Sequence, residues 1–361
     1  MAAKLSLNPL QLTRLENFGH SIQRPAYLFR PTHPEQLEEI FELANREGIN
    51  IALRGAGRSY GDAALASGGI VLDMQRMNRI LDWNPETGEI TVEPGVTIER
   101  LWRYIMEDGW WSPVMPGTMF PTIGGCLGAN VHGKNNWKTG TLGEHVVSFT
   151  ALLPNGKKVT CTPKKNKVLF YGIISGMGLL GVFTSITLQM KKIYSGNLEV
   201  KAWAEPNLTR MLKATDDFKE EDYIVGWVDS TARGRGRGRG QMHSARYLEP
   251  GEDPNPVQSL FPGSQDLPDT IMGLVPKSIR GQILGISLVL GIASYSAAMA
   301  TRVVNPPLTP QFVFGAVKDG FVWAAAFPMF ARAFGMRDPT DPTPAPVAPG
   351  PVAAPEAEDG V

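Results

Sequence analysis

The sequence has few cysteines and no excess of either charge. Cys126 and Cys161 are its two cysteines, and they form neither a CxxC pair nor a cluster with histidine at metal-ligand spacing. This argues against a disulfide framework and against a bound metal. Lysine plus arginine equals aspartate plus glutamate, at 35 each, so no overall field attracts nucleic acid. Residues 1–12 lack the continuous apolar run of a signal peptide, and we therefore expect a cytoplasmic protein.

What the sequence does contain is enough apolar material for two domains. Hydrophobic residues make up 43% of its 361 residues, which is enough to fill a substantial core in each. From residue 27 to 190, short β-rich runs alternate with glycine-dense loops, a pattern typical of the α+β class. We expect strands over 49–53, 69–72, 89–93, 146–153, 157–162, 182–190, 198–204 and 223–229.

Two helices are predicted among these strands. Thr32 and Glu35 fit a capping box that precedes apolar residues at helical spacing, and Gly48 is expected to end this first helix. The second helix is predicted to begin at Thr97 and to stop at Gly109. Both helices are expected to be scaffold.

The chain beyond residue 280 differs in character. Residues 281–301, between Arg280 and Arg302, carry no charge. This uncharged run is long enough for a membrane-spanning helix, although a buried helix would fit it as well. We expect an apolar, membrane-associated helical segment over 281–335. A tail rich in proline and alanine over 336–361 cannot bury enough apolar surface to fold and is expected to be disordered.

The chemistry is expected in three glycine-rich loops, each beside a predicted strand. The first is RGAGRSYGD, residues 54–62. Its glycines allow backbone N–H groups to converge on an anion such as a pyrophosphate, and Arg54 and Arg58 would add charge-assisted hydrogen bonds. A plain glycine-rich turn is the alternative. A Rossmann unit that uses Asp73 is disfavoured, because the interval before the next strand is too short for a crossover helix.

The second loop spans residues 116–134 and the third spans 175–182. Their many small residues suit the close approach of a large flat ligand. His132 and Lys134 are the reactive candidates at the edge of the second loop, although a structural histidine and a solvated lysine are the alternatives. Three such loops on one scaffold are harder to explain as turns than one loop is.

The order of these segments resembles the FAD-linked oxidase family with the PCMH-type flavin domain, the type found in vanillyl-alcohol oxidase. The resemblance is carried by RGAGRSYGD (54–62), PGT through TIGGCLGANVHGKN (116–135), GTLGEHV (140–146) and SGMGLLGVFTSITL (175–188), and it covers about Ala26 to Tyr247. It implies a two-lobed PCMH-type FAD-binding domain over 1–195, followed by a partial α+β substrate domain over 196–280. The closing lysine-bearing segment of the family has no counterpart here, so a truncated flavin-binding module without catalysis is the alternative to an enzyme.

Carried over residue by residue, the resemblance implies FAD as the cofactor. It places around FAD the residues Arg54, Gly55, Ala56, Gly57, Arg58, Ser59, Tyr60, Gly61, Gly117, Thr118, Thr122, Gly124, Gly125 and Val182. The family's covalent attachment uses a histidine in the first loop, and this loop has none, so we expect non-covalent FAD. Tyr60, His132 and Lys134 are placed beside the flavin ring as catalytic candidates, and Trp227 and Asp229 on the substrate side.

Arginine alternates with glycine from Arg233 to Gly240. We expect Arg235 and Arg237 to hold a phosphorylated or lipid-phosphate substrate. RNA binding is disfavoured because no aromatic residue neighbours these arginines.

The reaction implied by the resemblance is hydride transfer from a carbinol carbon to flavin N5, while a base accepts the hydroxyl proton. We expect an oxidoreductase acting on a small-molecule sugar or a polyprenyl-phospho-sugar alcohol at the cytoplasmic face of a membrane. An aldonolactone or alditol oxidase and a reductase of a carbon–carbon double bond are alternatives. The sequence leaves the electron acceptor open.

Overall fold

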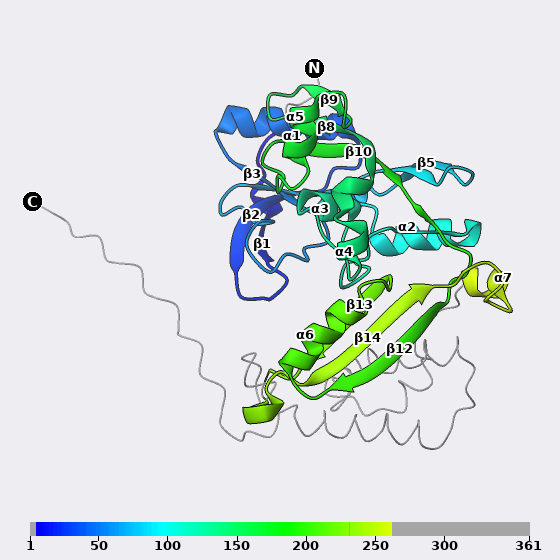
Figure 1. The fold of residues 1–361 in the computed structure, drawn as a ribbon. Coiled ribbons are helices and arrows are strands. Elements are labelled where there is room, and N and C mark those ends of the chain that lie inside the picture. Colours follow the sequence, from blue (N-terminus) through cyan, green and yellow to red (C-terminus); the bar gives the residue numbers. More distant parts are fainter. Residues whose placement is uncertain (1–4, 231, 262–361) are drawn as a thin grey trace, which may run out of the picture. The chain divides into compact units, whose positions relative to one another are not determined.

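A computed structural model of the protein describes residues 5–230 and 232–261, and all of them belong to one compact unit (Figure 1). The predicted apolar segment over 281–335 and the predicted tail over 336–361 lie outside the described residues. Within the described ranges, no helix has both the length and the apolar content needed to cross a bilayer.

The first sheet is built from the amino-terminal third of the described chain. Its strands are β1 (Leu12–Glu16), β2 (Gln23–Phe29), β3 (Ile51–Arg54) and β4 (Ile70–Asp73), in the order β1-β2-β4-β3. The central strand β4 runs parallel to both β2 and β3, while β1 and β2 are antiparallel. Helix α1 (Pro34–Glu47) packs the apolar face formed by Leu37, Ile40 and Phe41 against this sheet. The carboxyl end of β3 leads directly into the first glycine loop.

The predicted capping box of helix α1 is wrong. The helix begins at Pro34, whose ring fixes φ at a helical value and lacks the N–H that an N1 residue leaves unused. His33 is therefore the N-cap, without a side-chain cap, and Gln36 rather than Glu35 accepts the Thr32 N–H, at 2.7 Å. The predicted stop at Gly48 is confirmed, since this residue has a left-handed φ of 65°.

The second sheet is antiparallel and carries the largest core. Its strands are β5 (Ile80–Asn84), β6 (Glu89–Val92), β8 (Val146–Leu152), β9 (Lys158–Cys161) and β10 (Val182–Gln189), in the order β5-β6-β10-β8-β9. Helix α2 (Ile98–Ile105) buries Ile98, Leu101 and Ile105 in the same core, and Thr97 caps it as predicted. Gly109 ends the turn of 3-10 helix that follows, η3 (Met106–Asp108), with a φ of 75°.

The connection between β6 and β8 contains the whole second glycine loop and several short elements. They are the strand β7 (Trp110–Trp111), which pairs with β11 (Lys191–Lys192), the helices α3 (Ile123–Gly128) and α4 (Asn136–Thr139), and the turn η4 (Leu142–His145). Helix α5 (Lys167–Ile173) follows β9 and leads into the third glycine loop. The remaining 3-10 turns before these are η1 (Pro9–Gln11) and η2 (Met74–Arg76).

A third sheet follows residue 197. Its antiparallel strands are β12 (Leu198–Glu205), β13 (Tyr223–Val228) and β14 (Gly240–Tyr247), in the order β12-β14-β13. Helix α6 (Leu208–Asp217) covers one face, where Met211, Ile224 and Met242 form a small separate core. The turn η5 (Gly234–Gly236) and helix α7 (Pro256–Leu260) complete the described elements.

The predicted α+β class is confirmed, and each of the eight predicted strands is present with its ends moved by two residues or fewer. The sequence reasoning missed β1, β2, β5 and β14 and the two-residue strands β7 and β11. In β1 and β14, polar residues on both faces hide the alternation that marks a half-buried strand. The domain boundary at 195/196 stays a prediction, because residues on both sides of it belong to the same compact unit.

Candidate flavin site

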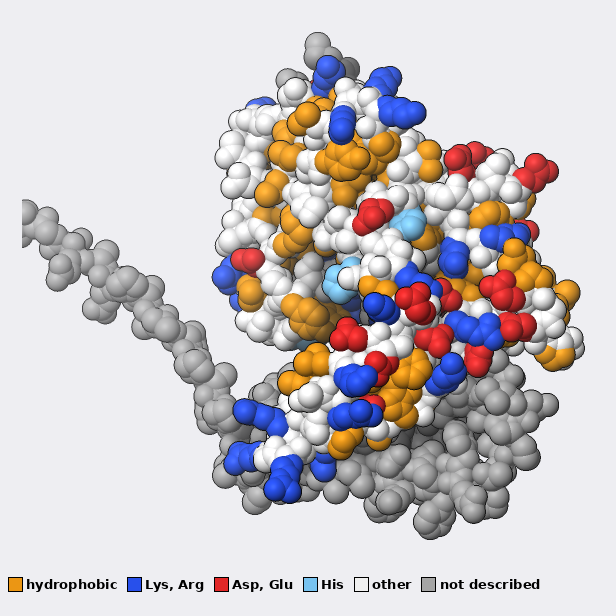
Figure 2. Space-filling model, in the orientation of Figure 1, with side chains coloured by type: hydrophobic (Ala, Val, Ile, Leu, Met, Phe, Trp, Pro, Cys, Tyr) orange, Lys and Arg blue, Asp and Glu red, His pale blue; other side chains and the backbone are white. Residues whose placement is uncertain are grey.

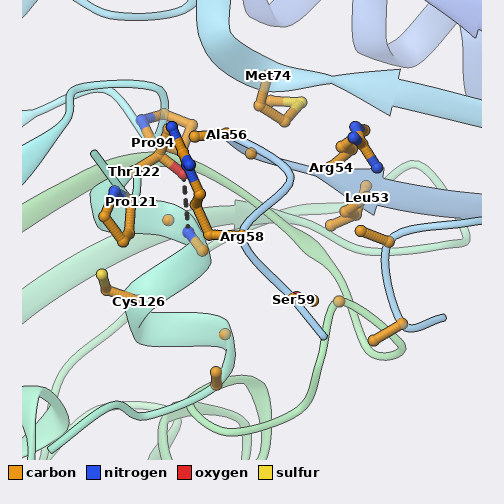
Figure 3. A pocket seen from close by; sticks show the side chains of 18 of the residues that line it. Leu53, Arg54, Ala56, Arg58, Ser59, Met74, Pro94, Pro121, Thr122 and Cys126 are labelled. Atoms are coloured by element: carbon orange, nitrogen blue, oxygen red, sulfur yellow. Dashed lines mark hydrogen bonds between the residues drawn. The ribbon is translucent and has the colours of Figure 1, made fainter. Parts of the chain in front are cut away.

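The three glycine loops meet at one cavity of about 320 Å³ (Figure 3). This volume lies at the lower end of the range typical of small-molecule sites. The first loop contributes residues 54–60 to its lining, directly after β3. The second and third loops contribute Pro121, Thr122, Gly124, Gly125, Cys126, Gly128, Ala129, Val131, Met177, Gly178, Gly181 and Val182. Segments that are more than a hundred residues apart in sequence thus form one site.

The first and second loops approach each other closely where Gly55 faces Thr122. A Cβ on Gly55 would lie 2.2 Å from Thr122 Oγ1, a distance that real side chains do not adopt. The same hydroxyl caps helix α3 by accepting the Gly125 N–H at 3.2 Å. Helix α3 is held in turn by the Gly124 N–H, which donates to the Pro94 carbonyl at 2.8 Å. Glycine at position 55 therefore allows the backbone of the first loop to lie against the capped start of this helix.

Arg54 contributes a half-buried positive charge beside the cavity. Its guanidinium folds back over Gly57, where a Cβ would lie 2.3 Å from Arg54 Nη2 and φ is 66°. Within the described part of the chain, the buried Nη1 atom has no hydrogen-bond partner. Loss of solvent lowers the pKa of Arg54, although the charge of nearby Asp73 opposes this shift. A buried guanidinium with an unused N–H is costly unless an anion accepts from it.

The third loop is attached to the carboxyl end of helix α3. The Ser175 N–H donates to Leu127 and the Met177 N–H donates to Gly128, at 3.1 and 3.0 Å. Ser175 and Met177 both have left-handed φ angles, 64° and 51°, which cost roughly 1–3 kcal/mol each. Gly178 has a φ of 80° and lies against Leu53 at the end of β3. Strained backbone at two non-glycine positions, separated by one glycine, beside a cavity is typical of a ligand site.

Arg58 lies at the same cavity but is held by aromatic rings. Its guanidinium carbon is 5.1 Å from the centroid of Phe18 and 4.9 Å from that of Phe120. This arrangement keeps the charge beside the cavity without neutralising it. Tyr60 packs edge-on against Phe18 and also lines the cavity, although 74% of the residue is exposed.

These features fit a large ligand that carries a phosphate group. The first loop lines the cavity beside Arg54, whose Nη1 atom has no hydrogen-bond partner among the described residues, and the glycines of all three loops leave room for close approach. Of the predicted cofactor residues, Gly61, Gly117 and Thr118 are not among those that line the cavity, whereas the other eleven are. The lining residues Met177, Cys126 and Pro94 were missed by sequence reasoning, because nothing in their type points to a cofactor.

His132 and Lys134 lie beyond helix α3 and do not line this cavity. His132 pairs with Thr141 in an isolated β-bridge. The Lys134 carbonyl accepts the Ile224 N–H at 3.2 Å, which brings strand β13 to the end of the second loop. The Lys134 side chain stays accessible, yet the surrounding protein displaces enough water to lower its pKa.

His243 is a neighbour of Lys134 that the sequence did not reveal. It lies on β14 opposite Val225 of β13, and its pKa is lowered first by burial and then by the positive charge of Lys134. Both groups are thus shifted towards their neutral forms. A lone histidine in an unpredicted strand carries no signal that could have identified it.

The predicted substrate residues lie on or after β13, and the structure does not bring them to the cavity. Trp227 is exposed on β13, and Asp229 accepts from Arg239 Nε and from the Ala232 N–H, both at 3.1 Å. Arg235 lies in the exposed turn η5, and the Arg237 carbonyl accepts the Leu208 N–H at the start of α6. Their role on the substrate side stays a prediction.

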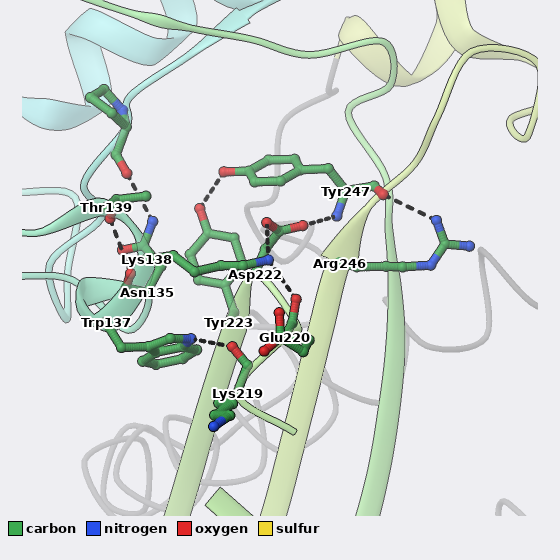
Figure 4. A network of polar contacts seen from close by, with 11 residues as sticks. Asn135, Trp137, Lys138, Thr139, Lys219, Glu220, Asp222, Tyr223, Arg246 and Tyr247 are labelled. Carbon is green, nitrogen blue, oxygen red and sulfur yellow. Dashed lines mark hydrogen bonds and ion pairs between the residues drawn. The ribbon is translucent and has the colours of Figure 1, made fainter. Parts of the chain in front are cut away.

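A polar network joins helix α4 to the start of β13 (Figure 4). Lys138 Nζ donates to the Glu220 carbonyl at 2.5 Å, and Trp137 Nε1 donates to the Lys219 carbonyl at 2.8 Å. Beside them the hydroxyls of Tyr223 and Tyr247 share a hydrogen bond of 2.5 Å, and burial raises the pKa of both phenols. Two separate backbone carbonyls thus attach the segment that leads into β13 to helix α4.

Comparison with known proteins identifies the class. Residues 25–162 match the family model described as an FAD binding domain. This part of the chain is an FAD-binding domain similar to those of FAD-linked oxidoreductases, and its cofactor is FAD. The prediction of this family, of its fold and of FAD is confirmed.

Individual relatives narrow the comparison. The chain is 31% identical over 229 residues to decaprenylphosphoryl-beta-D-ribose oxidase of Mycolicibacterium smegmatis, covering 62% of this chain and 50% of the relative. It is 30% identical over 165 residues to L-gulonolactone oxidase of Bos taurus, covering 46% and 37%. Its fold is similar to a solved structure of alkyldihydroxyacetonephosphate synthase, with a TM-score of 0.54, 16% identity and coverage of 63% and 48%. The chain thus spans half or less of the length of these relatives.

Proposed function

We propose that this chain acts as an FAD-dependent oxidoreductase that oxidises a hydroxyl group of a sugar or of a polyprenyl-phospho-sugar alcohol. The observation that carries the proposal is the unpaired Arg54 guanidinium at a cavity enclosed by three glycine loops. The substrate class is supported by the printed names of the relatives, which act on a polyprenyl-linked ribose and on a sugar lactone.

The backbone of the first loop would hold the pyrophosphate of FAD, and Arg54 would donate to it. Helix α3 and the third loop would enclose the remainder through Thr122, Gly125 and Val182. Bound FAD supplies a two-electron acceptor for a hydride from the substrate carbon. Neither histidine nor cysteine occurs between residues 54 and 62, so the binding is proposed to be non-covalent.

Lys134 is the proposed group that handles the proton of the substrate hydroxyl. Its lowered pKa makes the neutral amine accessible nearer to neutral pH, and a neutral amine accepts a proton whereas the ammonium ion does not. His132 is proposed to orient the substrate from the same segment. Tyr60, which is exposed at the cavity, would bound the ring end of the cofactor.

The cofactor part of the proposal is tested by an absorption spectrum of the purified chain before and after incubation with FAD. A flavin spectrum that stays with the protein on gel filtration is expected. Denaturation should release all flavin into the filtrate, since no covalent bond is proposed. A folded sample that remains colourless after incubation with FAD would contradict the proposal.

The catalytic part is tested by anaerobic mixing of the FAD-loaded chain with candidate substrates while flavin absorbance is followed. Phospho-ribosyl lipids, alditols and aldonolactones form the panel. Bleaching by one class identifies the substrate. If dithionite reduces the flavin and the reduced flavin is then reoxidised by an enone, the chain is a reductase of carbon–carbon double bonds. A chain that binds FAD but responds to none of these is a non-catalytic flavin-binding module.

The arginine-rich turn is tested within the same assay. We propose that Arg235 and Arg237 recognise the phosphate of a lipid-phosphate substrate, because both are exposed and lie two residues apart in and directly after the turn η5. Replacing both by alanine should raise the substrate concentration needed for half-maximal bleaching by a phosphorylated substrate, and leave a non-phosphorylated one unaffected. Equal effects on both substrates would contradict this role.

A further inference from the structure

The surface around helix α5 combines basic and apolar side chains and belongs to no site described above. Between Glu144 and Glu199 the sequence contains no aspartate or glutamate. Five lysines of this stretch lie in the β8–β9 hairpin and in the turn that leads into α5, and all are exposed: Lys157, Lys158, Lys164, Lys165 and Lys167. Within the described part of the chain, Lys158 is the one member with an ion pair, to Glu38 at 3.4 Å.

The turn that carries these lysines is well defined. The Thr162 hydroxyl accepts the Lys164 and Lys165 N–H groups at 3.2 and 2.8 Å, and the Asn166 side chain donates to the Thr160 carbonyl at 2.8 Å. The backbone of this turn therefore holds Lys164 and Lys165 beside each other despite their like charge. A cluster of lysines of this kind attracts an anionic partner electrostatically.

Large apolar side chains protrude beside the lysines. Val168 is 87% exposed and Leu179 is 80% exposed, and Tyr171 and Leu180 are also exposed. Val168 and Tyr171 are three residues apart on α5 and share one side of it. The Leu180 side chain lies against Gly172 of the same helix, so the third glycine loop extends this apolar surface. In Figure 2, orange side chains with blue ones around and above them occupy the upper part of the view, over α5.

We propose that this surface docks on an anionic lipid bilayer. We define it as the α5 face: the five lysines together with Val168, Tyr171, Leu179 and Leu180. Contiguous exposed apolar side chains mark interaction sites. A bilayer interface accepts protruding aliphatic side chains of any shape, while lysines beside them reach the lipid phosphates. The apolar residues stand out from a helix and a loop rather than lining a groove, which favours a bilayer over an acidic protein.

The α5 face adjoins the flavin cavity. Met177 and Gly178 line that cavity and directly precede Leu179 in the third loop. Docking through the α5 face would therefore bring the cavity close to the lipid surface. This position suits the lipid-linked substrate considered under the proposed function, but the docking itself does not depend on that function.

The test is binding of the full FAD-loaded chain to vesicles by co-sedimentation. Equimolar phosphatidylcholine and phosphatidylglycerol is compared with phosphatidylcholine alone, and binding is expected on the mixed vesicles. The variant K164Q/K165Q/K167Q should bind the mixed vesicles roughly a hundredfold more weakly, since each basic residue near an anionic surface contributes about fivefold. The variant V168S/L179S should lose the part of the binding that survives high salt. Both variants should keep the flavin spectrum, which shows that they fold.

The matched control is R14Q/R24Q/R100Q, which removes three exposed arginines from other elements. It should bind the mixed vesicles like the unmodified chain. Equal losses in the control and in the lysine variant would show that only net charge matters and would overturn the proposal. So would unchanged binding of the lysine variant, because the attachment would then come from another segment. A third outcome would assign the surface to an acidic protein instead. In that case the unmodified chain binds polyglutamate but not vesicles, and V168S/L179S still binds polyglutamate.

Discussion

The contact between Gly55 and Thr122 allows a prediction about how the flavin site is assembled. Replacing Gly55 by alanine places a Cβ 2.2 Å from Thr122 Oγ1, so the threonine must turn away and stop capping α3. Overpacking costs about 1–3 kcal/mol, and loss of the cap costs about 1 kcal/mol. We expect Gly55→Ala to lower the free energy of unfolding by roughly 2–4 kcal/mol and to weaken FAD binding, since both partners line the cavity.

A double-mutant cycle measures whether this contact is the cause. Thr122→Ala removes the cap and should cost about 1 kcal/mol alone. In its background the atom nearest to the new Cβ is gone, and the remaining distance, 3.3 Å to Thr122 Cβ, is tight but tolerable. The cost of Gly55→Ala should therefore fall to less than half in the double variant. Urea unfolding of the four proteins without FAD gives the coupling energy.

Additive effects in this cycle would refute the reasoning, because they would show that alanine at position 55 acts on something other than Thr122. Gly48→Ala is a useful comparison. Gly48 has a left-handed φ of 65°, and a Cβ added there would meet nothing within 4 Å. The loss of stability in Gly48→Ala should therefore come from backbone conformation alone and should be independent of Thr122.

Three further predictions concern charged groups. Arg54→Met should leave the FAD-free chain as stable as before or more so, because it removes a cation whose buried Nη1 atom has no partner among the described residues. The affinity for FAD, measured by fluorescence titration, should fall about tenfold or more through loss of a charge-assisted hydrogen bond. Unchanged affinity would contradict the role of Arg54. Lys134→Met should retain FAD but slow flavin reduction in single turnover. Burial lowers the pKa of Lys134 from 10.5, so the unfolded chain binds a proton that the folded chain has released. The stability of the unmodified chain relative to Lys134→Met should therefore rise as pH increases towards 10.5. A stability difference that does not change with pH would contradict this prediction. Hydrogen bonds from Arg246 and from the Glu249 N–H lower the pKa of Glu252 to about 2. Its contribution to stability is therefore present above pH 4.5 and lost as pH falls towards 2. In Glu252→Gln the free energy of unfolding should depend less steeply on pH in that window.

The pairing of Lys134 with His243 has a consequence for the proposed chemistry. Burial lowers the pKa of both groups, and the positive charge of Lys134 further lowers the pKa of His243. The hydrogen bond from the Ile224 N–H to the Lys134 carbonyl attaches β13 to the end of the second glycine loop, so the third sheet lies beside the proposed proton acceptor. The hydrogen bond from Lys138 to the Glu220 carbonyl attaches the segment before β13 to helix α4. The fold therefore sets the distance between Lys134 and the third sheet.

The candidate site was predicted from the sequence to the extent that it depends on backbone freedom. Glycine runs directly after apolar strands predicted three loops, and the structure brings all three to one cavity. Gly61, Gly117 and Thr118 fell outside its lining, since neighbouring residues in a loop can point in opposite directions. Met177 was missed because an exposed methionine gives no local sign that its backbone is left-handed.

Short-range information in the sequence determined the α+β class, the positions of eight strands and the caps at Thr97 and Gly48, and it predicted the glycine loops. These features depend on residues a few positions apart, whose spacing and conformational preferences can be read directly. The FAD cofactor was implied by the resemblance of these loops to a known family. Tertiary structure alone decided that Arg54 Nη1 is buried without a hydrogen-bond partner among the described residues, that Gly55 lies against Thr122, and that the positive charge of Lys134 acts on His243. The last two join segments distant in sequence, and they follow from how the sheets and loops pack rather than from any local preference.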